Sequence, residues 1–294
     1  MLFTGTGVAI VTPFKDDRTV DFDALSRIVN HCVDGQVDYI VVLGTTGEAM
    51  TLSDKEKAEV VRCVVDTVAG RVRIVIGIGG NDTAKVVESI KHTDFNSISG
   101  LLSATPYYNR PAQTGLIEHY KAVAAVSPVP VILYNVPSRA GINMTAETTL
   151  MLAHEVDNIV AIKEASGILA QMMQIVRDRP DNFSLISGDD AISLPLVALG
   201  GQGVISVVAN AFPREISTII HESLVNNYQT AQTIQYAMLD LFETLFVEGN
   251  PSGIKAALNI LGLSQNVLRL PLVSVSQKTY DKLETLIYKM KPSN

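Results

Sequence analysis

One lysine of the chain directly follows an apolar run of the kind that forms a buried strand. Four of the five residues before Lys163 are aliphatic or alanine, and such a run is typical of a parallel strand covered on both faces. Burial disfavours the ammonium form, so we expect a lowered pKa for Lys163 and a neutral amine that can form a Schiff base with a carbonyl compound. The alternative is a surface lysine whose stem covers an apolar edge while its ammonium group reaches water.

The segment 44–48, GTTGE, follows another aliphatic run and could hold a carboxylate. Its two glycines allow a tight turn that presents backbone amide groups beside the hydroxyls of Thr45 and Thr46. A plain turn is the alternative. A P-loop is not expected, because no Lys-Ser or Lys-Thr pair follows the glycines. The segment 77–82 resembles a dinucleotide fingerprint only superficially, since Asp82 stands where the third glycine belongs.

Three tyrosines stand at or shortly after the ends of two further aliphatic runs. Tyr107 and Tyr108 are adjacent in the segment 105–111, TPYYNRP. Neighbouring residues of an extended backbone point in different directions, so one tyrosine could donate a proton in a site while the other packs at an interface. Tyr134 is the last residue of its own apolar run. Aromatic packing alone remains the alternative for Tyr107 and Tyr108.

Arg139 stands in a segment bounded by proline and glycine, which we interpret as a rigid loop. A guanidinium held there suits bidentate capture of a carboxylate, and a solvated loop arginine is the alternative. Gly188 and Ile205 follow or lie in the last two apolar runs. We expect these two residues to form the floor of a pocket.

Composition and charge exclude several other classes of function. The chain of 294 residues has 47% hydrophobic and 18% charged residues, an ordinary globular composition. A net charge of -7 argues against non-specific nucleic-acid binding, which needs a basic surface. No apolar run has the length of a membrane span, and the first residues lack the features of a signal peptide. With only two cysteines and no disulfide framework, we expect a cytoplasmic protein.

The histidines do not form a recognisable metal site. They fall in or beside expected helices and away from the expected strand ends, at His31, His92, His119, His154 and His221. Neither an HExxH motif nor a G-x-S-x-G nucleophile elbow occurs. We therefore expect no metal and no separate cofactor. A lysine, hydroxyls, tyrosines and an arginine fit carbonyl chemistry through an imine.

The elements that would position these residues alternate regularly. Eight short apolar runs predict strands over 7–12, 39–43, 74–78, 98–104, 130–134, 159–163, 183–187 and 203–207. Amphipathic segments between them predict helices over 23–35, 53–69, from about 83, and over 115–125, 145–155, 169–177 and 192–199. Ser53 and Glu56 predict a capping box. Eight such repeats predict an α/β protein of the (β/α)₈ (TIM) barrel class, rather than a doubly wound open sheet.

The strand pattern stops at about residue 225. Helix-spaced apolar residues continue over 228–246, 251–261 and 277–290. We therefore divide the chain into a barrel, residues 1–225, that carries the active site, and a C-terminal helical region, residues 226–294. In such barrels the active site lies at the carboxyl ends of the strands, which is where the candidate residues fall.

Together these motifs resemble the dihydrodipicolinate synthase family of class I pyruvate lyases. The resemblance covers the whole chain, through FTGTGVAIVTPF, GTTGE, TPYYNRP, YNVPSRAG, IKEASG, SGDD, GVISV, LFVEGNP and LRLP. The wider superfamily, with N-acetylneuraminate lyase and 2-keto-3-deoxy-acid aldolases, shares the barrel and the imine lysine and is the alternative assignment. Arg139 and the two threonines of GTTGE resemble the synthase. A non-catalytic homologue that binds keto acids is a further alternative.

The resemblance implies a role for each candidate. Lys163 would form a Schiff base with pyruvate, and the enamine would add to L-aspartate 4-semialdehyde in lysine and diaminopimelate biosynthesis. Tyr134 would relay protons, with Thr45 and Tyr108 completing a hydroxyl chain in which Tyr108 reaches the site of a neighbouring subunit. Thr46 would bind the pyruvate carboxylate and Arg139 the semialdehyde carboxylate. The family also implies a homotetramer built as a dimer of dimers.

The sequence departs from the family pattern at the site where lysine inhibits some members of the family it resembles. Tyr107 and Asn81 match the positions that bind lysine at the dimer interface. Lys57 and Lys85 instead stand where sensitive members carry histidine and glutamate, and Asp54 replaces another histidine. Two added cations would repel the ammonium group of lysine. We therefore predict weak or absent feedback inhibition.

Overall fold

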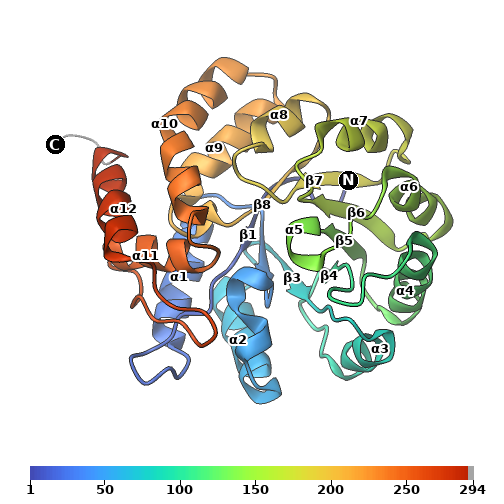
Figure 1. Cartoon of the computed structure of the whole chain (residues 1–294), viewed down its shortest axis with the longest axis horizontal. Coiled ribbons are helices and arrows are strands. Elements are labelled where there is room, and N and C mark those ends of the chain that lie inside the picture. Colours follow the sequence, from blue (N-terminus) through green and yellow to red (C-terminus); the bar gives the residue numbers. More distant parts are fainter. Residues whose placement is uncertain (291–294) are drawn as a thin grey trace.

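Eight parallel strands close into a barrel in chain order, with β8 pairing back onto β1 (Figure 1). The computed structural model describes residues 1–290. The strands are β1 (Gly5–Ala9), β2 (Tyr39–Val42), β3 (Arg73–Gly77), β4 (Gly100–Ala104), β5 (Val131–Asn135), β6 (Ile159–Glu164), β7 (Ser184–Ser187) and β8 (Gly203–Ser206). The predicted (β/α)₈ barrel is thereby confirmed.

Helices surround the barrel and connect its strands. They are α1 (Phe22–Asp34), α2 (Asp54–Val68), α3 (Thr83–His92), α4 (Gln113–Val126), α6 (Ala146–Glu155), α7 (Leu169–Asp178), α8 (Ser193–Ala198) and α9 (Pro213–Leu224). The capping box at the start of α2 is present, with Ser53 and Glu56 bonding each other's backbone amides. We did not predict α9, although Pro213 at its first position and Ile216, Ile219 and Ile220 on its buried face are helix signals.

β1 ends earlier than the predicted strand over 7–12, because a side chain replaces the ladder beyond Ala9 on the side of β8, while the Ile10 N–H still donates to Val41 of β2. The Asn210 Nδ2 donates to the carbonyl of Ala9 at 2.8 Å, and its Oδ1 accepts from the Val11 N–H at 3.0 Å. Asn210 thereby satisfies backbone groups that a longer strand would have paired. The chain turns away from the barrel there, toward the loops that cover its carboxyl end.

Two apolar layers follow from the alternation of side chains along each strand. One layer fills the interior of the barrel, and the other lies between the strands and the surrounding helices. On β6, Ala161 belongs to the interior layer and Ile162 to the outer one. The same alternation places Lys163 on the interior side, at the carboxyl end of the strand.

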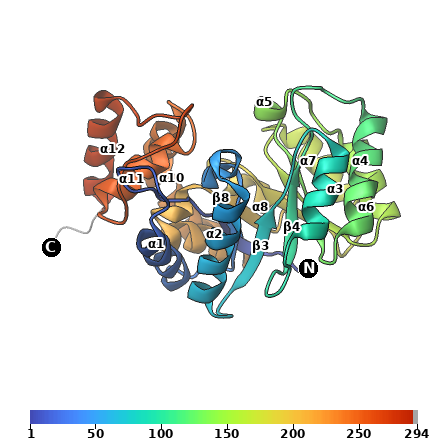
Figure 2. The same ribbon diagram turned by 90° about the horizontal axis from the view of Figure 1, so that it is seen from below.

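The predicted C-terminal helices are α10 (Tyr228–Phe246), α11 (Ser252–Ile260) and α12 (Gln277–Met290), which lie beside α1 and α9 (Figure 1). Seen at right angles, these helices and the loops around the short helix α5 (Pro137–Ala140) rise toward the same end of the barrel (Figure 2). A buried ion pair joins Lys255 of α11 to Glu48 in the loop after β2. Lys255 Nζ also lies 4.0 Å from the ring centroid of Phe14. The helical region is therefore fastened to the loops at the mouth of the barrel.

Arg269 adds a second fastening point between the same two parts of the molecule. Its guanidinium pairs with Glu56 on α2, and its backbone N–H donates to Glu48 Oε2 at 3.2 Å. The Arg269 side chain holds the pKa of the Glu56 carboxyl at about 2. Within residues 1–290, no helix combines the length and apolarity that crossing a membrane requires.

Candidate active site

A cavity of about 1820 Å³ opens at the carboxyl ends of the strands. Most of the residues predicted to form the site line this cavity: Thr45, Thr46, Tyr107, Tyr134, Arg139, Lys163 and Gly188. Tyr108, Asn81 and Ile205 are not part of its lining. Ile205 is instead fully buried in the barrel interior, where β8 pairs it with Gly7 of β1. It therefore packs below the cavity and not at its surface.

Lys163 lies at the inner end of this cavity with only 4% of its surface exposed. Burial lowers the pKa of its amine to about 8, with Asp190 opposing the shift and Arg139 adding to it. Gly188 leaves the room that the lysine stem occupies, because a Cβ there would approach Lys163 Cε to 3.1 Å and Ala165 Cβ to 2.7 Å. A side chain at this position would displace the amine.

Tyr134 is the direct neighbour of Lys163 across the β5–β6 pair. The lysine Nζ lies 4.4 Å from the centroid of the tyrosine ring. Burial raises the pKa of the Tyr134 phenol, while Arg139 and a hydrogen bond with the Thr45 side chain oppose that shift. The phenol therefore keeps its proton at neutral pH and stands beside the amine as a proton donor.

Asp190 does not line the cavity but is a buried residue whose charge influences Lys163, and we did not identify it from the sequence. Its carboxylate is 2% exposed and accepts hydrogen bonds from the Ser206 hydroxyl and from the N–H groups of Val207, at 3.0 Å, and Val208, at 3.3 Å. Burial raises its pKa to about 6 despite these bonds. Its charge in turn favours the ammonium form of Lys163. The SGDD motif was a signal, but it does not tell which aspartate is buried.

Arg139 lies in a short helix, α5 (Pro137–Ala140), and not in the loop that we predicted. Proline at the first helical position and Gly141, with a φ of 75°, after the last one are helix boundary signals. The Arg139 Nη2 donates to the carbonyl of Asn250 at 3.3 Å. The guanidinium is thereby held over the cavity by a residue from the C-terminal helical region.

Thr46 also contacts Asn250, which we had not singled out from the sequence. The Asn250 Nδ2 donates to the Thr46 hydroxyl at 3.0 Å, and both residues are buried. Thr45 and Thr46 lie in a single 3₁₀ turn, Thr45–Gly47. The turn directs both hydroxyl-bearing residues to the cavity that holds Lys163.

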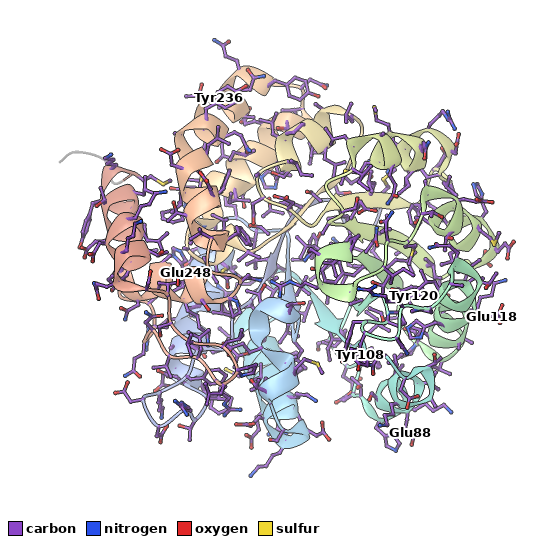
Figure 3. All side chains as sticks on the ribbon, in the orientation of Figure 1. Glu88, Tyr108, Glu118, Tyr120, Tyr236 and Glu248 are labelled. Carbon is purple, nitrogen blue, oxygen red and sulfur yellow. The ribbon has the colours of Figure 1, made fainter. Side chains whose placement is uncertain are left out.

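Tyr108 does not join the other catalytic candidates within one chain. Its side chain is 89% exposed and its φ of 74° is unusual for a bulky residue. Figure 3 shows it on the connection between β4 and α4, on the side of the molecule that carries α3. Asn109 ties this connection to the loop before α3 by donating to the carbonyl of the exposed Asn81 at 2.9 Å. Tyr107, in contrast, lines the cavity.

These groups can carry out chemistry on a carbonyl compound that bears a carboxylate. The amine of Lys163 is available as a nucleophile, the phenol of Tyr134 can move a proton, and Arg139 supplies a cation. Within residues 1–290, no three His, Cys, Asp or Glu side chains are grouped so that they could hold a metal ion. That the reaction needs neither a metal nor a cofactor remains a prediction.

Comparison with known proteins places the chain among enzymes of one kind. Residues 2–290 match the Dihydrodipicolinate synthetase family. The chain is 50% identical to 4-hydroxy-tetrahydrodipicolinate synthase of Parabacteroides distasonis, an alignment that covers 96% of this chain and 95% of the relative.

Two solved structures show the likeness in three dimensions. The lysine-bound enzyme from Cyanidioschyzon merolae is 41% identical with a TM-score of 0.94, and 98% of each chain is covered. The chloride-inhibited Acinetobacter baumannii enzyme in complex with pyruvate is 36% identical with a TM-score of 0.94, covering 97% of this chain and 98% of the other.

Imine formation at Lys163 should follow the pKa of its amine. Because only the neutral amine attacks, the rate constant should rise with pH and level off above about 8, and not near the ordinary lysine value of 10.5. Asp190→Asn should move the midpoint lower, because Asp190 favours the ammonium form. The measurement is borohydride quenching of the pyruvate adduct in single-turnover experiments across pH.

Asp189, which is exposed and lines the cavity, offers a matched control, since Asp189→Asn changes the adjacent charge but not the buried carboxylate. It should leave the midpoint nearly unchanged. A wild-type midpoint near 10.5, or an upward shift in Asp190→Asn, would contradict the electrostatic interpretation of the site.

Proposed function

The chain belongs to the dihydrodipicolinate synthetase family and is a lyase with the activity of its 4-hydroxy-tetrahydrodipicolinate synthase relatives, and we propose that it performs this reaction through an imine at Lys163. The substrates are pyruvate and L-aspartate 4-semialdehyde, and no cofactor takes part. The observation that carries this mechanism is the buried amine beside Tyr134, with its pKa lowered to about 8.

The first half of the reaction activates pyruvate. The neutral Nζ of Lys163 adds to the keto carbon of pyruvate, and the keto oxygen leaves as water after protonation. Tyr134 supplies a proton to that oxygen and is reprotonated through the Thr45 hydroxyl. The protonated imine then withdraws electrons, so a methyl proton is lost and an enamine forms.

The second half joins the two substrates. The enamine carbon attacks the aldehyde carbon of the semialdehyde, and the aldehyde oxygen takes a proton and becomes a hydroxyl group. The amino group of the semialdehyde portion then attacks the imine carbon, which closes the ring and releases Lys163 as a free amine. Tyr134 again moves protons to and from the reacting nitrogen and oxygen atoms.

Two separate groups hold the two carboxylates. Thr46 binds that of pyruvate through its hydroxyl and amide, close to the lysine that reacts. Arg139 lies farther out, on α5, and binds that of the semialdehyde. The Acinetobacter baumannii relative was crystallised with pyruvate, which supports pyruvate as the first substrate here. A sugar-acid lyase would not require a cation at the position of Arg139.

We also propose a homotetramer, a dimer of dimers, in the cytoplasm. The exposed Tyr108 would form one interface with a neighbouring subunit. A second interface would use apolar side chains exposed at the start of α7 and the end of α8: Ile168, Leu169, Met173 and Leu199. Both cysteines are free, which fits a reducing compartment.

Arg139→Ala should separate the two carboxylate sites. Loss of a charge-assisted contact should lower kcat/KM for the semialdehyde roughly 100-fold, while pyruvate is still trapped by borohydride. A dehydrogenase-linked assay of the product measures the first quantity, with N-acetylneuraminate as a substrate that should not turn over. Arg177→Ala, an exposed arginine on α7, is the matched control and should be unaffected. Loss of both activities together would mean that Arg139 has a structural role.

Mixed oligomers should test whether Tyr108 acts in the site of another subunit. Lys163→Ala and Tyr108→Phe should each be nearly inactive. In a hybrid dimer, one site combines an intact lysine with an intact tyrosine, so random co-assembly should restore about a quarter of the sites. Co-expression with two affinity tags, followed by the product assay, measures this. Failure to regain activity in purified hybrids would place Tyr108 outside the neighbouring site.

Lysine should inhibit the enzyme weakly or not at all. Lys57, paired with Asp54 at 3.0 Å, and Lys85, 4.0 Å from Asp82, both line the same cavity and would repel a lysine ammonium group. Initial rates measured against lysine concentration check this. The double variant Lys57→His with Lys85→Glu should be more sensitive. A wild-type enzyme that loses half its activity at sub-millimolar lysine would contradict the prediction.

A further inference from the structure

Asn250 reaches the active site from outside the barrel. It lies in the connection between α10 and α11, is 9% exposed and lines the cavity that contains Lys163. The first residues of α11, directly after this connection, are firmly packed, because a Cβ at Gly253 would overlap the carbonyl of Leu245 at 2.0 Å. The Ser252 hydroxyl further donates to the carbonyl of Val273 at 2.8 Å. Asn250 is thus presented from a fixed backbone.

The side chain of Asn250 decides what the Thr46 hydroxyl can do. A hydroxyl group has one proton to donate and two lone pairs that accept. Because the Asn250 Nδ2 donates to the Thr46 oxygen at 3.0 Å, one lone pair is occupied and the hydroxyl proton stays free for a ligand. Thr46 is therefore oriented as a hydrogen-bond donor, which is what recognition of a carboxylate requires.

The backbone carbonyl of the same residue restrains Arg139, the cation that we propose for the second carboxylate. The carbonyl of Asn250 accepts from Arg139 Nη2 at 3.3 Å, which uses one of the five guanidinium N–H donors. The remaining donors stay available for bidentate binding. A single residue thus contacts both Thr46 and Arg139, which lie on different loops of the barrel.

The remaining polar atom of Asn250 argues against a role in stability alone. Its Oδ1 is buried and has no hydrogen-bond partner among residues 1–290. A buried acceptor without a partner is unfavourable for folding, so its presence calls for an explanation other than stability. The Asn250 amide therefore has a hydrogen-bond partner at Nδ2, which is Thr46, and none at Oδ1 among residues 1–290.

We infer that Asn250 is a positioning residue that orients Thr46 directly and Arg139 through its backbone, so the C-terminal helical region completes both carboxylate sites. This inference rests on the proposed function, because it concerns how the two substrates are held. Asn250 does not touch the reacting atoms. Its effect should appear in the binding of the substrates before it appears in the chemical step.

The first test is Asn250→Ala. Loss of the bond to Thr46 should raise KM for pyruvate roughly three- to tenfold with little change in kcat. The KM for the semialdehyde should rise less, because the backbone carbonyl that binds Arg139 remains. Asn259→Ala is the matched control, since Asn259 on α11 bonds Ser264 and Tyr280 and lies outside the cavity lining. It should leave both KM values within about twofold.

A double-mutant cycle separates positioning from general destabilisation. Thr46→Val removes the hydroxyl that Asn250 orients, so adding Asn250→Ala to Thr46→Val should change KM for pyruvate by less than about twofold. Independent effects would instead multiply. Asn250→Asp keeps the shape of the side chain and serves if the alanine variant does not fold. It should raise KM for pyruvate more than alanine does, because it places a second carboxylate beside that of the substrate.

The outcomes distinguish this inference from the function on which it rests. A wild-type enzyme that neither traps nor turns over pyruvate would overturn the proposed function, and the role of Asn250 with it. A normal wild-type enzyme with an unchanged KM for pyruvate in Asn250→Ala and Asn250→Asp would overturn the positioning role alone. Multiplicative effects in the cycle with Thr46→Val would do the same.

Discussion

The active site depends on the burial of one amine at the end of a barrel strand. Moving the pKa of Lys163 from 10.5 to about 8 disfavours its ammonium form by about 3 kcal/mol. Close packing enforces this burial, because Gly188 gives the stem room and Tyr134 lies beside the amine. Asp190 limits the shift, and in the proposed mechanism it would supply a negative charge to the protonated imine. In the proposed mechanism, the site thus keeps the free lysine reactive and can still accommodate the cationic intermediate.

The barrel supplies the reactive groups, and the C-terminal helical region holds them in place. Glu48, beside the two threonines, is ion-paired with Lys255 on α11. Asn250, five residues earlier in the chain, bonds both Thr46 and Arg139. Two contacts therefore connect the loop after β2 to the C-terminal helical region. The active site therefore includes residues from both sides of our division at residue 225. That division separates two kinds of secondary structure and does not bound the site.

Local patterns predicted much of this structure, and contacts between distant segments account for what they missed. Apolar runs and the rule that sites lie at strand ends were enough to select Lys163 and Tyr134. Asp189 and Asp190 are adjacent and identical in type, so only the fold shows which one is buried. Asn250 and Asn210 bond residues about 200 positions away, and no local pattern reports such contacts. The misassigned helix around Arg139 was different, because its proline and glycine signals were present.

The most direct test of the account is to locate the covalent intermediate. The protein is incubated with pyruvate, reduced with borohydride and analysed by intact-mass and peptide mass spectrometry. The account predicts one reduced pyruvate adduct per chain, on Lys163, and none in Lys163→Ala. An unchanged wild-type mass, or an adduct that persists in Lys163→Ala, would contradict the assignment of Lys163 as the nucleophile.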